Sequence, residues 1–181
     1  MRVLVAYASK YGATREIAER IAETLGRHGL VTAVQEVSKA DEPAEFDSVV
    51  IGSASYFFHW MRASSSFVRR HRETLMAMPV WLYSSGPLGT KQRDDRGRDL
   101  RLVTEPKEIE EFRLAIHPRG HRVFFGALTA EKLGMVHRAV YKMMENLDRS
   151  LVPEGDFRNW GEIEEWAGSI AQTLKEGQWA G

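Results

Sequence analysis

Short apolar runs alternate along this chain with segments whose apolar residues recur at helical spacing. Residues 3–8 form an almost uninterrupted apolar run, which is typical of a strand covered on both faces. Residues 17–25 instead carry apolar side chains on one helical face and charged side chains on the opposite face. Gly26 or Gly29 can end that helix. The chain therefore opens with a strand followed by an amphipathic helix.

The same alternation continues to the end of the chain. Residues 31–37 alternate apolar and polar side chains, which indicates an edge strand. Asn159 and Glu162 have the spacing of a capping box at the start of the last helix. Repeated strand–helix alternation predicts a single domain over residues 1–181, with one parallel sheet and helices on both faces. Further strands are expected at residues 48–52, 79–83 and 122–126, and further helices at 63–75, 106–116 and 163–174.

Composition narrows the chemistry that this domain can perform. The chain has no cysteine, which excludes disulfides, iron–sulfur clusters and cysteine catalysis, so any redox chemistry must belong to a bound cofactor. Its 25 basic and 25 acidic residues lack the basic excess expected of a nucleic-acid-binding protein. No metal-binding motif is present, and no metal site is expected. Neither a signal-peptide pattern nor a membrane-spanning apolar run occurs, so the expected location is the cytoplasm.

The turn between the first strand and the first helix has the composition of a phosphate-binding turn. Backbone N–H groups and the positive end of a helix dipole meet there, and serine and threonine hydroxyls can add hydrogen bonds to an anion. The turn matches neither the Walker sequence nor the dinucleotide-binding glycine motif. An alternative without a ligand remains open, in which the two hydroxyls only cap the helix. The predicted phosphate contacts are Ser9, Lys10, Tyr11, Gly12, Ala13 and Thr14.

The order of Ser9, Gly12 and Thr14 after an initial strand resembles the FMN phosphate loop of flavodoxins. Residues 50–60 resemble the second flavin loop of that family, and the similarity extends over nearly the whole chain. Residues 126–128 and 159–160 are similar to the menaquinone-dependent protoporphyrinogen IX dehydrogenase branch of flavodoxin-like proteins. The resemblance implies FMN as the cofactor. It also implies a flavodoxin-like α/β fold, a doubly wound five-stranded parallel sheet in the order 2-1-3-4-5.

Two further loops complete the predicted flavin site, because ligands of such sheets lie beyond the carboxyl ends of the strands. Tyr56 or Trp60 is expected to contact the isoalloxazine ring. His59 is the one catalytic candidate: it can donate to the flavin or move a proton, or it can only fix the loop, and both readings stay open. The remaining predicted cofactor contacts are Ser53, Ala54, Ser55, Phe57, Phe58, Ser84, Ser85, Gly86, Pro87, Leu88 and Gly89.

Three functions fit these features. The first is an FMN-dependent oxidoreductase that acts on a planar hydrophobic small molecule or a quinone. The second is an electron carrier with a redox protein as partner, and the third is a binding module without cofactor. Carrier flavodoxins are typically strongly acidic, whereas this chain is neutral, which favours the enzyme. Four arginines expected near the flavin edge also favour the enzyme: Arg62, Arg69, Arg70 and Arg72. Self-association into a homo-oligomer stays open.

A basic amphipathic segment at residues 131–144 is a second candidate for a functional contact. Val136, Val140, Met143 and Met144 recur at helical spacing, and Lys132, Arg138 and Lys142 add positive charge. Such a helix can rest against the inner face of an anionic membrane, contact an acidic substrate, or pack on its own core. The resembled dehydrogenases carry an apolar, basic insertion in this region, but the present segment lacks their aromatic-rich run.

Overall fold

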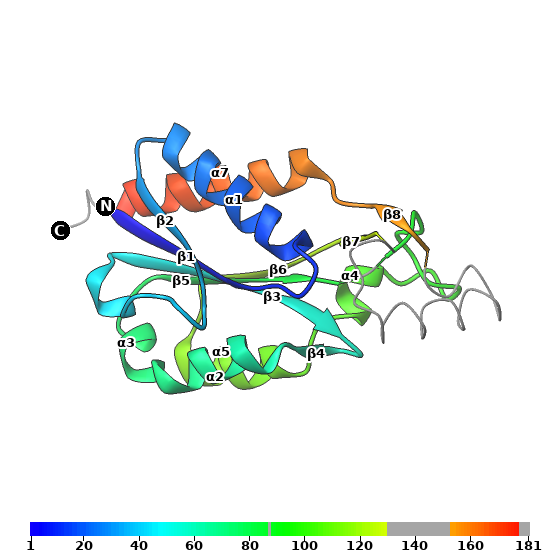
Figure 1. Ribbon diagram of the computed structural model, residues 1–181, viewed down its shortest axis with the longest axis horizontal. Helices are drawn as coiled ribbons and strands as arrows, with labels where there is room; N and C mark the ends of the chain where they lie inside the picture. Colours follow the sequence, from blue (N-terminus) through cyan, green and yellow to red (C-terminus); the bar gives the residue numbers. More distant parts are fainter. Residues whose placement is uncertain (87, 130–152, 178–181) are drawn as a thin grey trace.

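The computed structural model describes residues 1–86, 88–129 and 153–177, and its centre is a parallel sheet of five long strands (Figure 1). Their order across the sheet is β2-β1-β3-β5-β6. Numbered along the chain without the short strand β4, this is the predicted order, and β2 is the predicted edge strand. The strands are β1 (Arg2–Ala8), β2 (Val31–Glu36), β3 (Ser48–Tyr56), β5 (Val80–Ser85) and β6 (Gly120–Phe124).

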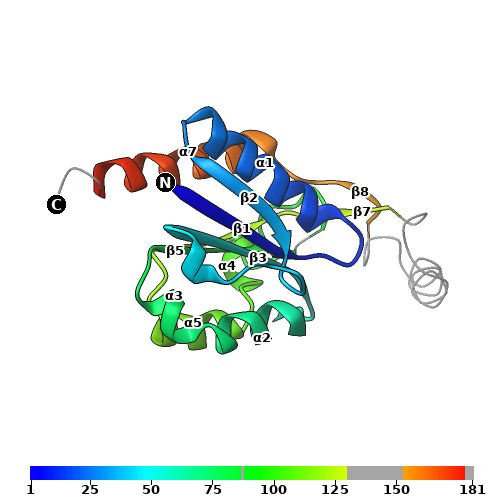
Figure 2. The same cartoon turned by 60° about the vertical axis from the view of Figure 1, so that its left-hand side comes forward.

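Helices cover both faces of the sheet, as the alternation predicts. On one face lie α1 (Ala13–Arg27) and α7 (Trp160–Gly177), and on the other lie α2 (Arg62–Arg70), α3 (Arg72–Met76) and α5 (Glu108–Ile116) (Figures 1 and 2). The single helix predicted at 63–75 is wrong in one respect, because it breaks at His71, whose ring packs on Phe67 at 4.7 Å. The short elements are η1 (Pro43–Glu45), β4 (His59–Trp60), α4 (Leu100–Val103), β7 (Ala127–Leu128) and β8 (Gly155–Asp156).

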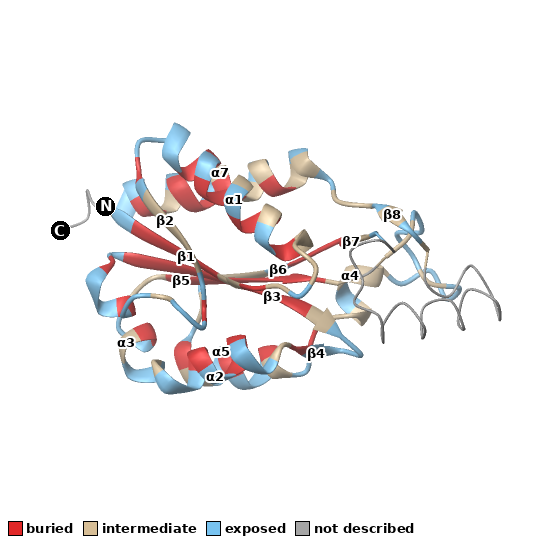
Figure 3. Ribbon diagram, viewed as in Figure 1, coloured by how far each residue is buried: buried red, intermediate tan, exposed pale blue. Residues whose placement is uncertain are grey.

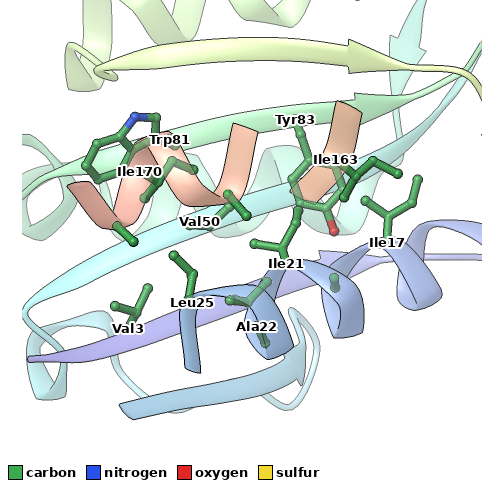
Figure 4. Close-up of a cluster of buried hydrophobic side chains, with 14 of the residues drawn as sticks. Val3, Ile17, Ile21, Ala22, Leu25, Val50, Trp81, Tyr83, Ile163 and Ile170 are labelled. Atoms are coloured by element: carbon green, nitrogen blue, oxygen red, sulfur yellow. The ribbon is translucent and has the colours of Figure 1, made fainter. Parts of the chain in front are cut away.

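Alternate residues of the central strands belong to two separate hydrophobic clusters. Figure 3 shows that the central strands are buried between the two helical layers. Val3 and Val5 point towards α1 and α7, whereas Leu4 and Ala6 point towards the opposite helical layer. Burial on both faces explains why the strand at residues 3–8 is apolar almost throughout. Figure 4 shows the first cluster, in which Tyr83 lies among isoleucines of α1 and α7.

The start of α7 makes half of the predicted capping box. Asn159 Oδ1 accepts a hydrogen bond from the amide of Glu162 at 3.2 Å. The Glu162 carboxylate pairs instead with Arg101 at 2.9 Å and with Arg122 at 3.4 Å. Its charge thus ties α7 to α4 and β6 rather than closing the box.

Two predictions fall outside the described residues: the basic segment 131–144, with its contact to membrane, substrate or core, and Pro87. Within the described ranges, no helix is both long and apolar enough to cross a bilayer. The short strands β7 and β8 pair as a small antiparallel ribbon (Figure 1).

Candidate functional site

Three predicted loops converge on one cleft at the carboxyl ends of the strands, together with the residues of β7. Residues 126–128 line the cleft, although the sequence predicts no cofactor contact for them. They belong there because β6 adjoins β5 in the sheet and carries the chain to the same edge. The lining residues are Ser9, Tyr11, Ala13, Thr14, Ala54, Ser55, Tyr56, Ser85, Gly86, Leu88, Gly126, Ala127 and Leu128.

The turn before α1 has unused hydrogen-bonding capacity. Ser9 Oγ accepts from the amide of Gly12 at 3.0 Å, and Gly12 adopts a φ of 91°, which favours glycine. Thr14 is 1% exposed, and its hydroxyl has no hydrogen-bond partner among the described residues. The N-cap residue of α1 is Gly12, which has no side chain to cap the first turn. The two hydroxyls therefore do not act as simple helix caps, and the turn suits an anion.

A tyrosine beneath the turn supports it from the core. Tyr83 is fully buried, and its hydroxyl donates to the carbonyl oxygen of Thr14 at 3.3 Å. The ring occupies the space above Gly52, where the Cβ of any larger residue would lie 1.8 Å from Tyr83 Cζ. The position therefore requires glycine, and the contact joins β3, β5 and the start of α1 in one rigid unit.

Strand β4 forms a hairpin with β3, in which Tyr56 pairs with His59. The two turn residues, Phe57 and Phe58, have φ values of 50° and 63°, which side-chain-bearing residues rarely adopt. Their side chains are 90% and 49% exposed. Two phenylalanines in a strained and exposed turn are unfavourable for the fold, and they lie next to Tyr56, which lines the cleft.

Three predicted contacts lie behind the cleft. Trp60 is 4% exposed, packs on Phe112 at 5.4 Å and donates from Nε1 to Ser84 Oγ at 2.7 Å. Ser53 Oγ accepts from the amide of Met61 and donates to the carbonyl of Ala54, both at 3.0 Å. Trp60 belongs to the core, which corrects the expected ring contact, whereas Tyr56 does line the cleft.

The remaining predicted contacts flank the cleft rather than line it. Lys10 is exposed and places Nζ 5.7 Å from the centre of the Tyr11 ring. Gly89 adopts a φ of 101° in the loop after β5. Phe57 and Phe58 lie at the hairpin turn.

His59 fixes the hairpin through a hydrogen bond to Glu108. Its Nδ1 lies 2.9 Å from Glu108 Oε1, and the amide of Trp60 donates to Glu108 Oε2 at 3.2 Å. Burial raises the pKa of Glu108, but the hydrogen bonds from His59 and from backbone amides outweigh it and hold the pKa below its usual range. The loop-fixing reading of His59 has direct geometric support, and a catalytic role stays a prediction.

The arginines expected at the flavin edge are separated by the length of α2. Arg62 begins α2 next to β4, but Arg69 and Arg70 end it near α3, which lies at the other end of the strands (Figure 1). Arg69 also pairs with Glu111 at 2.7 Å. Only Arg62 is near the cleft, because a helix of this length carries the chain away from the carboxyl edge.

A partly buried polar network that no local sequence pattern reveals links β5 and β6 to α5 and the segment before it. His121 Nε2 lies 2.8 Å from Ser84 Oγ, and His121 Nδ1 lies 2.9 Å from Glu105 Oε1. Arg113 donates to the same carboxylate at 2.7 Å. The arrangement resembles a serine–histidine–acid triad, but Ser84 is fully buried and already accepts from Trp60. Its geometry serves to brace β5, β6 and β4.

Acidification is expected to destabilise the fold through His121. Burial lowers its pKa below the ordinary 6.5, Arg113 lowers it further, and Glu105 opposes both. A depressed pKa means that neutral His121 stabilises the fold above pH 6.5, and this contribution is lost as the pH falls through the folded-state value. Urea unfolding between pH 7 and 5 should therefore show a steeper loss of stability in the native protein than in His121→Gln. Parallel curves would contradict the prediction.

The parallel sheet order and the cleft at its carboxyl edge define a flavodoxin-like α/β protein. Residues 4–150 match a family model described as a flavodoxin domain, and the chain belongs to that family. Protoporphyrinogen IX dehydrogenase (quinone) of Escherichia coli strain K12 is 35% identical over 86 residues, which are 46% of this chain and 48% of that protein. The chain thus aligns with about half the length of the curated relatives it matches.

Solved structures share the fold at low sequence identity. An archaeal flavodoxin has a TM-score of 0.57 at 16% identity, with 97% of this chain and 99% of that chain covered. A flavodoxin variant from Pseudomonas aeruginosa has a TM-score of 0.58 at 15% identity, with the same coverage of both chains. Rubredoxin oxygen:oxidoreductase of Desulfovibrio gigas reaches 0.60 at 10% identity, with 97% of this chain and 36% of that chain covered.

Proposed function

We propose that the protein binds FMN in this cleft and passes electrons between a planar hydrophobic substrate and an acceptor such as a quinone. The observation that carries the proposal is the hydroxyl of Thr14, which is buried at the cleft without a partner among the described residues. An unpartnered buried hydroxyl costs about 1–3 kcal/mol, and a phosphate oxygen at the turn would accept its hydrogen bond. Membership of the flavodoxin-domain family supports FMN as the cofactor, and the name of the dehydrogenase relatives supports a quinone as the acceptor.

The residues of the cleft fit the parts of FMN. Ser9, Thr14 and the free amides of the first turn of α1 would hold the phosphate. Tyr56 offers an aromatic face for the ring, and the backbone at Ser85 and Leu88 would meet its polar edge. FMN supplies the redox chemistry when bound, while the protein supplies orientation and a partly dry environment.

Binding and turnover test the proposal separately. The purified protein should quench FMN fluorescence with a micromolar or lower Kd, and the loaded protein should be reduced or reoxidised by menadione or protoporphyrinogen. Absence of FMN binding at these concentrations would overturn the proposal in favour of a binding module. Binding without small-molecule turnover, but with electron exchange with a redox protein, would favour the carrier function.

Relieving the strain in the turn of the β3–β4 hairpin is expected to raise the stability of the fold and to weaken substrate binding. Phe57→Asn combined with Phe58→Gly fits the positive φ values and should stabilise the fold by about 1 kcal/mol. The same change removes the exposed aromatic surface beside Tyr56, so the KM for menadione should rise. The Kd for FMN should stay unchanged, since neither phenylalanine lines the cleft. An unchanged KM would exclude the turn from substrate binding.

A further inference from the structure

Arg158, a buried arginine in the segment after β8, makes a hydrogen bond and an ion pair with the start of α1. The Arg158 side chain is 6% exposed, and its Nη1 donates to the carbonyl oxygen of Ala13 at 3.1 Å. Its Nη2 lies 2.8 Å from Glu16 Oε2 and 2.6 Å from Asp156 Oδ2. The guanidinium also stacks 4.4 Å from the centre of the Trp160 ring. Arg158 thus contacts the phosphate-binding turn from the side of the C-terminal segment.

The carboxylate of Glu16 would otherwise oppose an anion at this turn. Glu16 is the acidic residue in the first turn of α1, and its Oε1 lies 3.8 Å from the place that a Cβ at Gly12 would occupy. A carboxylate so close to Gly12 repels a phosphate dianion bound to the same turn. The positive charge of Arg158 offsets the negative charges of Glu16 and Asp156. Replacing Arg158 with a neutral residue removes this compensation.

The hydrogen bond to Ala13 anchors Arg158 to the start of α1. The carbonyl of Ala13 and the N–H of Thr14 belong to one planar trans peptide, so they point in opposite directions. Because Ala13 begins α1, the helix itself directs the N–H of Thr14 towards the turn, and Arg158 braces this first peptide through its carbonyl oxygen. Arg158 therefore neutralises charge beside the turn and supports the peptide that the turn leads into.

We propose that Arg158 is a positioning residue that makes the turn before α1 selective for a phosphate-bearing flavin over an unphosphorylated one. The inference rests on the proposed FMN function and deepens it. Arg158 does not line the cleft, so it acts through Glu16 and the Ala13 peptide rather than by touching the ligand. Its effect must then appear for FMN and be absent for riboflavin, which shares the ring but has no phosphate.

The test compares FMN and riboflavin affinities by fluorescence quenching. Arg158→Gln should weaken FMN binding by about tenfold or more and leave riboflavin binding within about twofold. Arg158→Lys should restore part of the loss, because it keeps the charge without the bidentate geometry. Arg20→Gln is the matched control: Arg20 stacks on the same Trp160 ring at 4.8 Å but pairs with Glu164 instead of the turn.

A second variant keeps the proposal testable should Arg158→Gln fail to fold. Glu16→Gln in the native background removes the opposing carboxylate and should tighten FMN binding without changing riboflavin binding. Equal losses for both flavins in Arg158→Gln, or no effect of Glu16→Gln on FMN, would overturn the role of Arg158. A native protein that binds neither flavin would instead overturn the proposed function itself, so the two failures are distinguishable.

Discussion

Replacing Ser9 with Asp is expected to weaken FMN binding by roughly a hundredfold, because it places a negative charge against the phosphate in a partly buried turn. An aspartate oxygen can still accept the hydrogen bond from the amide of Gly12 that Ser9 Oγ accepts now. The turn should therefore keep its shape while its charge changes. Riboflavin affinity should change by less than about threefold, since no phosphate is present to be repelled.

Ser9→Asn is the control for size, because it matches Asp in shape and carries no charge. It should cost FMN far less than Ser9→Asp does, and the difference should shrink as salt is raised. If Asp and Asn weaken FMN equally, or if riboflavin falls in step with FMN, the turn before α1 is not where the phosphate binds.

Gly52→Ala is expected to destabilise the fold by about 3 kcal/mol or more, because its Cβ would overlap the fully buried Tyr83 ring. Neither partner can yield cheaply: Gly52 lies within β3, and the Tyr83 hydroxyl is bound to the carbonyl of Thr14. Chemical denaturation followed by circular dichroism measures the loss. A ring pushed aside would also release Thr14, so the surviving folded protein should bind FMN more weakly.

Gly26→Ala is the matched control for this substitution. Gly26 lies in α1, where an added Cβ would meet nothing within 4 Å, so the same change should stabilise the protein by about 0.5–1 kcal/mol. In a Tyr83→Ala background, Gly52→Ala should cost less than about 1 kcal/mol, since the clash is gone. A full cost in that background would show that Gly52 is needed for a reason other than Tyr83.

Much of this fold is predictable because its signals are local. The strand at residues 3–8 is apolar on both faces, and β2 alternates, because one lies in the middle of the sheet and the other at its edge. The phosphate-binding turn is also local, since its hydroxyls and Gly12 fall within six consecutive residues. Periodicity and turn composition contain that information directly.

The wrong or missing predictions concern residues whose environment is set by contacts with residues distant in the sequence. Trp60 looks like any aromatic residue after a strand, and only its contacts with Phe112 and Ser84 place it in the core. The β4 hairpin has no Asn or Gly at its turn, so its signal is missing. Arg158 meets Glu16 across more than a hundred residues, and no local pattern encodes that pair.

The last described helix has a consequence for how the protein is made. Ile163, Ala167 and Ile170 of α7 complete the apolar layer over β1, β3 and β5 that α1 begins to cover. During translation, the strands of this layer leave the ribosome long before α7 does. Until α7 packs on them, their apolar side chains remain partly exposed to solvent. Native packing of that face therefore waits for α7, and a nascent chain stalled ahead of α7 should bind chaperones.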